Sequence, residues 1–194
     1  IRKYFDMITP DMRDVISLTV GQPDFVTPWH IREAGIQSLE TGKTFYTANA
    51  GLEELRIEID NYMTRRFGLS YNYKNEIIVT VGGSEAIDIA MRATLDIGDE
   101  VIIPTPSFVC YEPLARMAGA VPVILETTFE DEFKINPDKL KSLITDRTKM
   151  IILPFPSNPT GSIMTHDELE EIAEIIRDTN IVILSDEIYA EMTY

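Results

Sequence analysis

The chain has 194 residues, with 17 Lys and Arg against 32 Asp and Glu, so its formal net charge is −15 at pH 7. Hydrophobic residues make up 44% and charged residues 25%, a balance that is typical of globular proteins and excludes a disordered chain. The negative charge argues against nucleic-acid partners and anionic membranes, and a single cysteine, Cys110, excludes a disulfide framework or a multi-cysteine metal site.

Two helices are expected in the first third of the chain. The first lies between Thr27, which can act as its N-cap, and Gly42, which can end it, with Pro28 in the first turn. The second covers residues 51–67, where apolar side chains recur at helical spacing, and Gly68 follows it.

From residue 76 onward the pattern changes to strands that alternate with helices. The expected strands are 77–81, 101–104, 121–125, 149–153 and 181–185, and the expected helices are 84–96, 109–118, 137–145 and 165–178. Thr165 and Glu168 form a capping box at the start of the last helix. Five short β-branched strands separated by helices predict an α/β fold, a three-layer αβα sandwich around a mostly parallel sheet.

The loops that follow these strands carry the chemistry, because ligands of such sheets bind at the carboxyl ends of the strands. The loop residues are Gly82-Gly83-Ser84, Pro106-Ser107-Phe108, Asn158-Pro159-Thr160-Gly161 and Asp186-Glu187-Ile188-Tyr189. Two glycines and a serine at a helix start suit a phosphate, although a tight turn with an ordinary N-cap serine would look the same. The loop is neither a Walker loop nor a dinucleotide fingerprint.

The other three loops point to a flat, nitrogen-containing ring. Phe108 offers an aromatic face, and Asn158 is held between two prolines. Asp186 follows an apolar strand, so its carboxylate needs a cationic or N–H partner, and Tyr189 can reach the same ligand. A phosphate, an aromatic ring, a ring nitrogen and a ring oxygen together describe pyridoxal 5′-phosphate (PLP).

On these motifs the chain resembles the class I aminotransferases of the type I PLP fold, particularly the bacterial and archaeal branch that includes aspartate, aromatic and diaminopimelate-type aminotransferases. The motifs occur in the family's order: Gly21-Gln22-Pro23-Asp24, Tyr46 with Gly51-Leu52, Gly82-Gly83-Ser84-Glu85-Ala86, Pro106-Ser107-Phe108, Asn158-Pro159-Thr160-Gly161 and Ser185-Asp186-Glu187-Ile188-Tyr189. The resemblance implies a domain division, with residues 1–45 as an N-terminal arm and the start of the small domain. Residues 46–194 are then the first part of the PLP-binding large domain, whose remainder is absent.

The resemblance also implies roles for these residues around PLP. Gly83 and Ser84 would bind the phosphate, and Gly82 would shape the turn. Phe108 would stack on the pyridine ring. Asn158 and Tyr189 would hydrogen-bond its phenolic oxygen, while Asp186 would pair with its nitrogen.

Two further roles, two cis peptides and a dimer follow from the same resemblance. Gly21 would approach the substrate's α-carboxylate, and Tyr46 would reach the cofactor phosphate of a second subunit, so a homodimer is expected. Cis peptide bonds are expected before Pro106 and Pro159.

The lysine that forms the Schiff base with PLP in this family is not found in the chain. Its seven lysines are Lys3, Lys43, Lys74, Lys134, Lys139, Lys141 and Lys149, and none follows a predicted strand. Lys149 begins a strand, which places it roughly 16 Å from the carboxyl end. We therefore expect the N-terminal half of an aminotransferase, inactive alone, that in full length exchanges an amino group between an amino acid and a 2-oxo acid by a ping-pong mechanism.

Three other functions are open to such a sequence. A C–S β-lyase would use the same fold, cofactor and residues. A non-catalytic PLP-binding domain, such as the effector half of a transcription regulator, is less favoured because no basic region precedes Gly21. A nucleotide-binding Rossmann protein is less favoured because it does not account for the 158–161 and the 186–189 motifs. No apolar run approaches the roughly 18 to 20 residues of a membrane span, so a cytoplasmic protein without membrane or nucleic-acid partners is expected.

Overall fold

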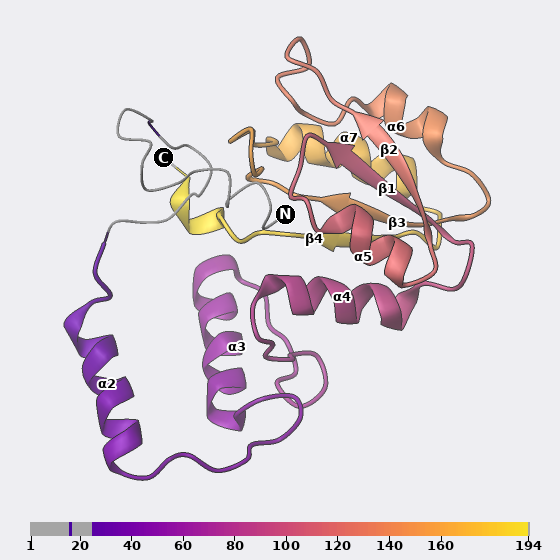
Figure 1. The fold of residues 1–194 in the computed structure, drawn as a ribbon. Coiled ribbons are helices and arrows are strands. Elements are labelled where there is room, and N and C mark those ends of the chain that lie inside the picture. The colour runs from indigo at the N-terminus through magenta and orange to yellow at the C-terminus, as the bar shows by residue number, and fades with distance from the viewer. Residues whose placement is uncertain (1–15, 17–24, 194) are drawn as a thin grey trace. The chain divides into compact units, whose positions relative to one another are not determined.

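The computed structural model describes residue 16 and residues 25–193. These residues belong to two compact units that divide between Ile77 and Ile78. The first unit contains two long helices, and the second contains a parallel sheet with helices packed on it (Figure 1). The α/β fold class expected from the sequence is confirmed. The proposed division into residues 1–45 and 46–194 stays a prediction.

The first helix of the N-terminal unit is α2, Trp29–Glu40. The expectation that Thr27 caps it is wrong, because the N-cap is Pro28 and no side chain caps the helix. The Pro28 carbonyl accepts from the N–H groups of Ile31 and Arg32 at 3.1 and 3.2 Å. An N-cap side chain reaches the second or third residue after it, so Thr27 lies one position too early to act.

Glycines end both helices of this unit, as expected. Gly42 lies just beyond α2 with φ +70, and Gly68 follows α3, Glu53–Phe67, with the same φ. Within α3 the buried residue is Arg56, whose guanidinium donates to the Tyr73 carbonyl and so ties the helix to the segment after it. The left-handed conformation of the two glycines turns the chain away from each helix.

The sheet of the second unit is entirely parallel. Its strands are β1 (Glu100–Thr105), β2 (Val121–Glu126), β3 (Thr148–Leu153) and β4 (Val182–Ser185), in the order β2-β1-β3-β4. In the register, Ile103 lies opposite Ile124 and Ile152 opposite Leu184. A parallel order requires every connection to cross over one face, and the helices between the strands supply these crossovers.

The expected first strand, residues 77–81, is not formed in the described part of the chain, so the sheet has four strands rather than five. The side chain of Val81 is 93% exposed, and Ile78 is also exposed. β-branched residues favour an extended backbone, but a strand also requires a partner that pairs with its N–H and C=O groups. Segment 77–81 has the composition of a strand without such a partner among the described residues.

Helices cover both faces of the sheet, as the sandwich prediction requires (Figure 1). On one face α4 (Gly83–Thr94) and α5 (Tyr111–Met117) pack on Val101, Ile103, Met150 and Ile152. On the other face α6 (Pro137–Leu143) and α7 (His166–Ile176) pack on Ile102, Leu125 and Ile151. Neighbouring strand residues alternate between the two cores, because successive side chains of a strand point to opposite faces.

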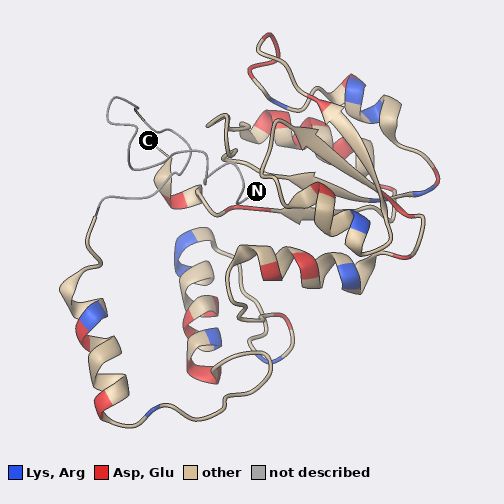
Figure 2. Ribbon diagram, in the orientation of Figure 1, with Lys and Arg blue, Asp and Glu red and all other residues tan. Residues whose placement is uncertain are grey.

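Two of these helices begin with strong side-chain caps. Asn136 accepts from the N–H groups of Asp138 and Lys139 at the start of α6. The capping box of Thr165 and Glu168 is present at the start of α7, as predicted. Charged side chains lie mainly on the helices and loops of this unit, and the middles of the strands carry few (Figure 2). The strands are therefore an apolar scaffold whose polar groups are concentrated at their ends.

Candidate functional site

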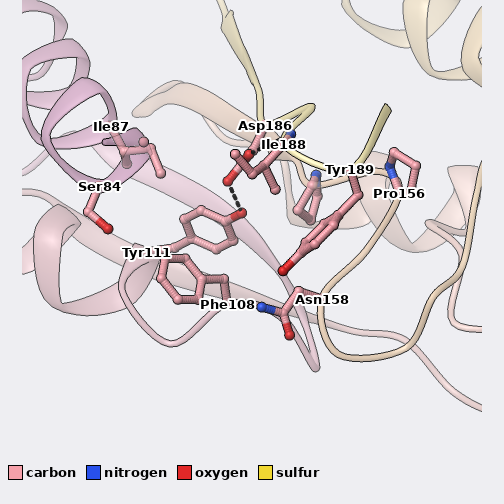
Figure 3. A pocket seen from close by; sticks show the side chains of 11 residues that line it. Ser84, Ile87, Phe108, Tyr111, Pro156, Asn158, Asp186, Ile188 and Tyr189 are labelled. Atoms are coloured by element: carbon pink, nitrogen blue, oxygen red, sulfur yellow. Dashed lines mark hydrogen bonds between the residues drawn. The ribbon is translucent and has the colours of Figure 1, made fainter. Parts of the chain in front are cut away.

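The carboxyl ends of the strands and the start of α4 surround a cavity of about 180 Å³. Its lining is Gly83, Ser84, Ile87, Phe108, Tyr111, Pro154, Pro156, Asn158, Asp186, Ile188 and Tyr189 (Figure 3). Six of these residues were predicted from the sequence as cofactor-binding residues: Gly83, Ser84, Phe108, Asn158, Asp186 and Tyr189. The structure brings them together from the start of α4 and three loops, and their individual roles stay predictions.

The start of α4 is suited to an anion. Gly82 precedes the helix with φ +86, a conformation that favours glycine, and no side chain caps the helix. A Cβ added at Gly83 would meet no atom within 4 Å, so there is open space beside the first turn. The first N–H groups of an α-helix have no partner within the helix, and together with the Ser84 hydroxyl they form a set of donors for a phosphate.

Phe108 lies at the end of the loop after β1. Its ring meets the Tyr111 ring edge-on, with centroids 5.8 Å apart and an angle of 85° between the planes. The loop contains the expected cis peptide before Pro106, and the expected cis peptide before Pro159 is also present. A third cis peptide, before Pro156, was not predicted.

Asn158 and Tyr189 come from the loops after β3 and β4. Figure 3 shows the Asn158 amide and the Tyr189 hydroxyl directed toward the same part of the cavity. Both residues also line a second hollow of about 550 Å³, which Pro159 and Met192 border. Two donor groups on one side of the cavity can bind a single anionic oxygen.

Asp186 is half-buried at the end of β4, and its backbone continues the parallel ladder by donating to the Leu153 carbonyl at 3.0 Å. Its Oδ2 accepts from the Tyr111 hydroxyl at 2.7 Å. Its Oδ1 accepts from the Ile188 N–H at the longer distance of 3.3 Å. The carboxylate thus has one short bond to a neutral donor and remaining capacity to accept.

Tyr111 is the polar residue of the cavity lining that the sequence did not predict. It is only 2% exposed, and it begins α5 in the middle of an apolar core. Its spacing of three residues from Phe108 is a weak signal for a shared site, because buried aromatic residues near a helix start are usually core residues. Only the contact with Asp186, 75 positions along the chain, distinguishes it.

Cys110 lies beside the cavity and has the properties of a structural residue. Burial raises the pKa of its thiol to about 11, and an interaction with Ser84 opposes this effect only in part. A thiol with such a pKa stays protonated at neutral pH and is a poor nucleophile. Cys110 is therefore a small packed residue rather than a catalytic one.

Four residues singled out from the sequence lie away from the cavity or outside the described residues. Tyr46 belongs to the N-terminal unit, where its side chain is fully exposed. Gly21 lies outside the described residues, as does Lys3. Lys149 borders a different hollow, lined by Asp99, Arg147 and Asn180 among others, at the amino end of the sheet. It is therefore placed at the far end of β3, as its position in the sequence predicted.

Among residues 16 and 25–193, no group of three or more His, Cys, Asp or Glu side chains could hold a metal ion. Within the same part of the chain, none of the helices combines the length and the apolar character needed to cross a bilayer.

Comparison with known proteins identifies a matching family model and similar sequences. A family model described as Aminotransferase class I and II matches residues 13–194. YugH of Bacillus subtilis (strain 168), an aminotransferase by name, is 53% identical over 194 residues, which are 100% of this chain and 50% of that protein. An aspartate aminotransferase of Pyrococcus abyssi is 43% identical over 194 residues, with the same coverage.

The solved structures agree. The aromatic aminotransferase from Pyrococcus horikoshii OT3 superposes with a TM-score of 0.90 at 40% sequence identity, covering 100% of this chain and 51% of that chain. The chain spans about half the length of the relatives it matches.

Proposed function

The chain belongs to the class I and II aminotransferase family, and we propose that it forms part of a PLP-dependent enzyme that transfers an amino group between an amino acid and a 2-oxo acid. The observation that carries this proposal is the convergence of Ser84, Asn158, Asp186 and Tyr189 on one cavity. Each supplies the chemistry that one part of PLP requires, and they come from three segments that are far apart in the sequence.

The described residues fit the cofactor. The uncapped start of α4 and the Ser84 hydroxyl offer donors to a phosphate, and the Phe108 ring offers an aromatic face. The half-buried Asp186 has a neutral hydroxyl as its short partner, so its negative charge remains to be paired with a ligand. PLP, when bound, supplies an electron sink for the bond that is broken at the amino acid's α-carbon.

Different residues of the chain then hold different parts of the cofactor. Ser84 and the first N–H groups of α4 bind the phosphate and fix the position of the ring. Asp186 holds a proton at the ring nitrogen, which strengthens the electron sink. Asn158 and Tyr189 donate to the ring oxygen, and Phe108 covers one face of the ring and excludes water from it.

Two parts of the proposal involve residues beyond this cavity. The lysine that binds PLP covalently would come from a part of the protein that this chain does not contain, because none of the lysines in the described residues lines the cavity. The 194-residue chain alone would then not catalyse transamination. Tyr46, with its exposed side chain, would reach the cofactor phosphate of a second subunit in a homodimer.

The test is made on the whole protein purified with PLP. Borohydride reduction followed by intact mass measurement should show one added pyridoxyl phosphate per subunit, and the 194-residue chain treated in the same way should show none. Initial rates with an amino acid and a 2-oxo acid should give the parallel double-reciprocal lines of a ping-pong mechanism. Release of ammonia and a 2-oxo acid from a sulfur-containing amino acid, without transamination, would instead indicate a β-lyase.

The dimer is tested separately. Light scattering should give twice the subunit mass for the whole protein, and Tyr46→Phe should weaken PLP binding without changing that mass. A monomer that binds PLP with full affinity would contradict the role of Tyr46. It would not contradict the aminotransferase activity, which the rate measurements test.

A further inference from the structure

The contact between Tyr111 and Asp186 joins two elements that are distant in the sequence. The Tyr111 hydroxyl donates to Asp186 Oδ2 at 2.7 Å, and this hydrogen bond links the start of α5 to the end of β4 (Figure 3). Tyr111 is packed in the core formed by α4, α5 and the sheet. Its ring also meets the Phe108 ring edge-on. The position of the hydroxyl is thus fixed by packing on several sides.

The chemical state of Tyr111 makes it a permanent donor. Burial raises the pKa of its hydroxyl, and the hydrogen bond to Asp186 and the charge of that carboxylate raise it further. Cys110 and Tyr189 are the other titratable groups that contribute, and both act in the same direction. Tyr111 therefore stays protonated throughout the pH range in which enzymes work, and it can only donate to the carboxylate.

The charge of the donor matters for what Asp186 can do. A lysine, arginine or protonated histidine in this position would neutralise the carboxylate, whereas a phenol fixes it and leaves the negative charge in place. The described residues that line the cavity include no Lys, Arg or His. Asp186 Oδ1, with only the long contact to the Ile188 N–H, keeps capacity for a further donor.

We propose that Tyr111 is a positioning residue for the cofactor site: its neutral hydroxyl orients the Asp186 carboxylate and preserves the negative charge that pairs with the protonated ring nitrogen. This inference rests on the proposed function, because it assumes PLP in the cavity. Tyr111 acts through Asp186 and has no part in the proton transfer at the substrate.

The experiment compares two cofactors in the apoprotein of the whole enzyme. One is PLP, and the other is 1-deaza-PLP, in which a C–H group replaces the ring nitrogen. The dissociation constant of each is measured for the wild type, for Tyr111→Phe and for the matched control Tyr71→Phe. Tyr71 lies in the N-terminal unit, and its ring is exposed. Thermal unfolding of each apoprotein shows that the variants are folded.

We expect Tyr111→Phe to weaken PLP binding by about ten-fold, the effect of removing one hydrogen bond to a charged group. The affinity for 1-deaza-PLP should change by less than about two-fold, because that analogue has no ring nitrogen for Asp186 to pair with. Tyr71→Phe should leave both affinities unchanged. Equal losses for the two cofactors would show that Tyr111 only supports the fold of the site, and no loss for either would also overturn the proposal.

A second variant keeps the test valid if the phenylalanine substitution unfolds the protein. Incorporation of a tetrafluorinated tyrosine at position 111 keeps the size and the hydroxyl, but this phenol ionises at a much lower pH. Above its ionisation it no longer donates to Asp186, so PLP affinity should fall while 1-deaza-PLP affinity changes less. A parallel fall for both cofactors would overturn the proposal. Wild-type protein that fails to bind PLP would overturn the proposed function itself, and this outcome is read before any variant is compared.

Discussion

The two ends of the parallel sheet each hold a carboxylate, and these carboxylates have different partners. At the amino end Glu100 is 4% exposed and accepts from the Thr145 hydroxyl and the Arg147 guanidinium, each at 2.6 Å. At the carboxyl end Asp186 is half-buried and has one short bond, from the neutral hydroxyl of Tyr111. Glu100 is thus compensated by a cation as well as a hydroxyl, whereas Asp186 has a hydroxyl and no cationic partner among the described residues.

This difference separates a structural carboxylate from a functional one. The pKa of Glu100 is lowered, first by the Thr145 hydroxyl and then by Arg147, against the opposing effect of burial. Its backbone N–H also donates to the Arg147 carbonyl at 2.8 Å, so the cluster ties the start of β1 to the loop before β3. A buried group with all partners supplied stabilises the fold, whereas one with spare capacity in a cavity is available to a ligand.

The largest effect is expected from Asp186→Asn in the whole enzyme. Asparagine can still accept from Tyr111, but it carries no charge to hold a proton at the ring nitrogen. We expect kcat/KM for transamination to fall by roughly two to three orders of magnitude. The free energy of unfolding of the apoprotein should change by less than about 1 kcal/mol, since most of the structural contacts remain.

The matched control is Asp96→Asn, an exposed aspartate just after α4, which should change neither quantity. If Asp186→Asn kept its kcat/KM but lowered the free energy of unfolding, Asp186 would be a structural carboxylate like Glu100, and the contrast between the two would disappear.

The opposite result is expected from Glu100→Gln. One carboxylate oxygen becomes an NH₂ group that faces a donor, because donors already point at both Oε1 and Oε2. The free energy of unfolding should fall by about 1–3 kcal/mol, measured in urea. Activity at saturating PLP should stay within about two-fold of the wild type. Glu130→Gln, an exposed loop substitution, is the control and should be neutral.

The sequence predicted the cavity well because parallel topology places the carboxyl ends of the strands at one edge. Asn158 and Asp186 each follow a strand of the sheet, so their convergence follows once the strands are known. Ser84 lies at the start of α4 after segment 77–81, which is not a strand in the described part of the chain. Residues 77–81 show the limit of that reasoning. Their composition indicates an extended segment, but pairing depends on a neighbouring strand, and local sequence does not report whether one is present.

Tyr111 could not be predicted for a different reason. In the sequence it is one of several aromatic residues near an expected helix start, and its value depends on a hydroxyl that meets a carboxylate 75 residues away. The Glu100 cluster is similar, since Thr145 and Arg147 are loop residues whose partner lies in another strand. Hydrogen bonds between distant segments are set by packing, which neither periodicity nor motifs report.

Glu100 and Tyr111, at the two ends of the sheet, should also limit stability at opposite ends of the pH scale. Glu100 has a folded pKa below its ordinary value of 4.5, so its contribution is present above pH 4.5 and is lost as the pH falls through the folded pKa. Tyr111, bonded to Asp186, has a folded pKa above 10.0, so its contribution is present below pH 10 and is lost as the pH rises beyond it.

Denaturation midpoints measured across pH test this pair of limits. Glu100→Gln should make the free energy of unfolding less dependent on pH on the acid side of its profile, which we call the acid limb. Tyr111→Phe should do the same on the alkaline side, the alkaline limb. Each slope should fall by up to about 1.4 kcal/mol per pH unit. Each variant should leave the other limb unchanged. If Glu100→Gln altered the alkaline limb as well, the two ends of the sheet would be coupled and the comparison would no longer describe independent sites.

The smallest effects separate the two partners of Glu100. The Arg147 side chain is 70% exposed, so its ion pair is screened by solvent, and Arg147→Gln should cost about 0.5 kcal/mol or less. Thr145→Val removes the hydroxyl that most strongly lowers the pKa of Glu100, and it should cost about 1 kcal/mol.

Salt distinguishes the two substitutions. At about 1 M salt, where the screening length falls to about 3 Å, the effect of Arg147→Gln should vanish and that of Thr145→Val should remain. Equal salt sensitivity would mean that charge rather than hydrogen bonding holds Glu100. The amino end of the sheet would then be stabilised by an exposed ion pair, and the contrast with the neutral donor at Asp186 would rest on the charge of the partner alone.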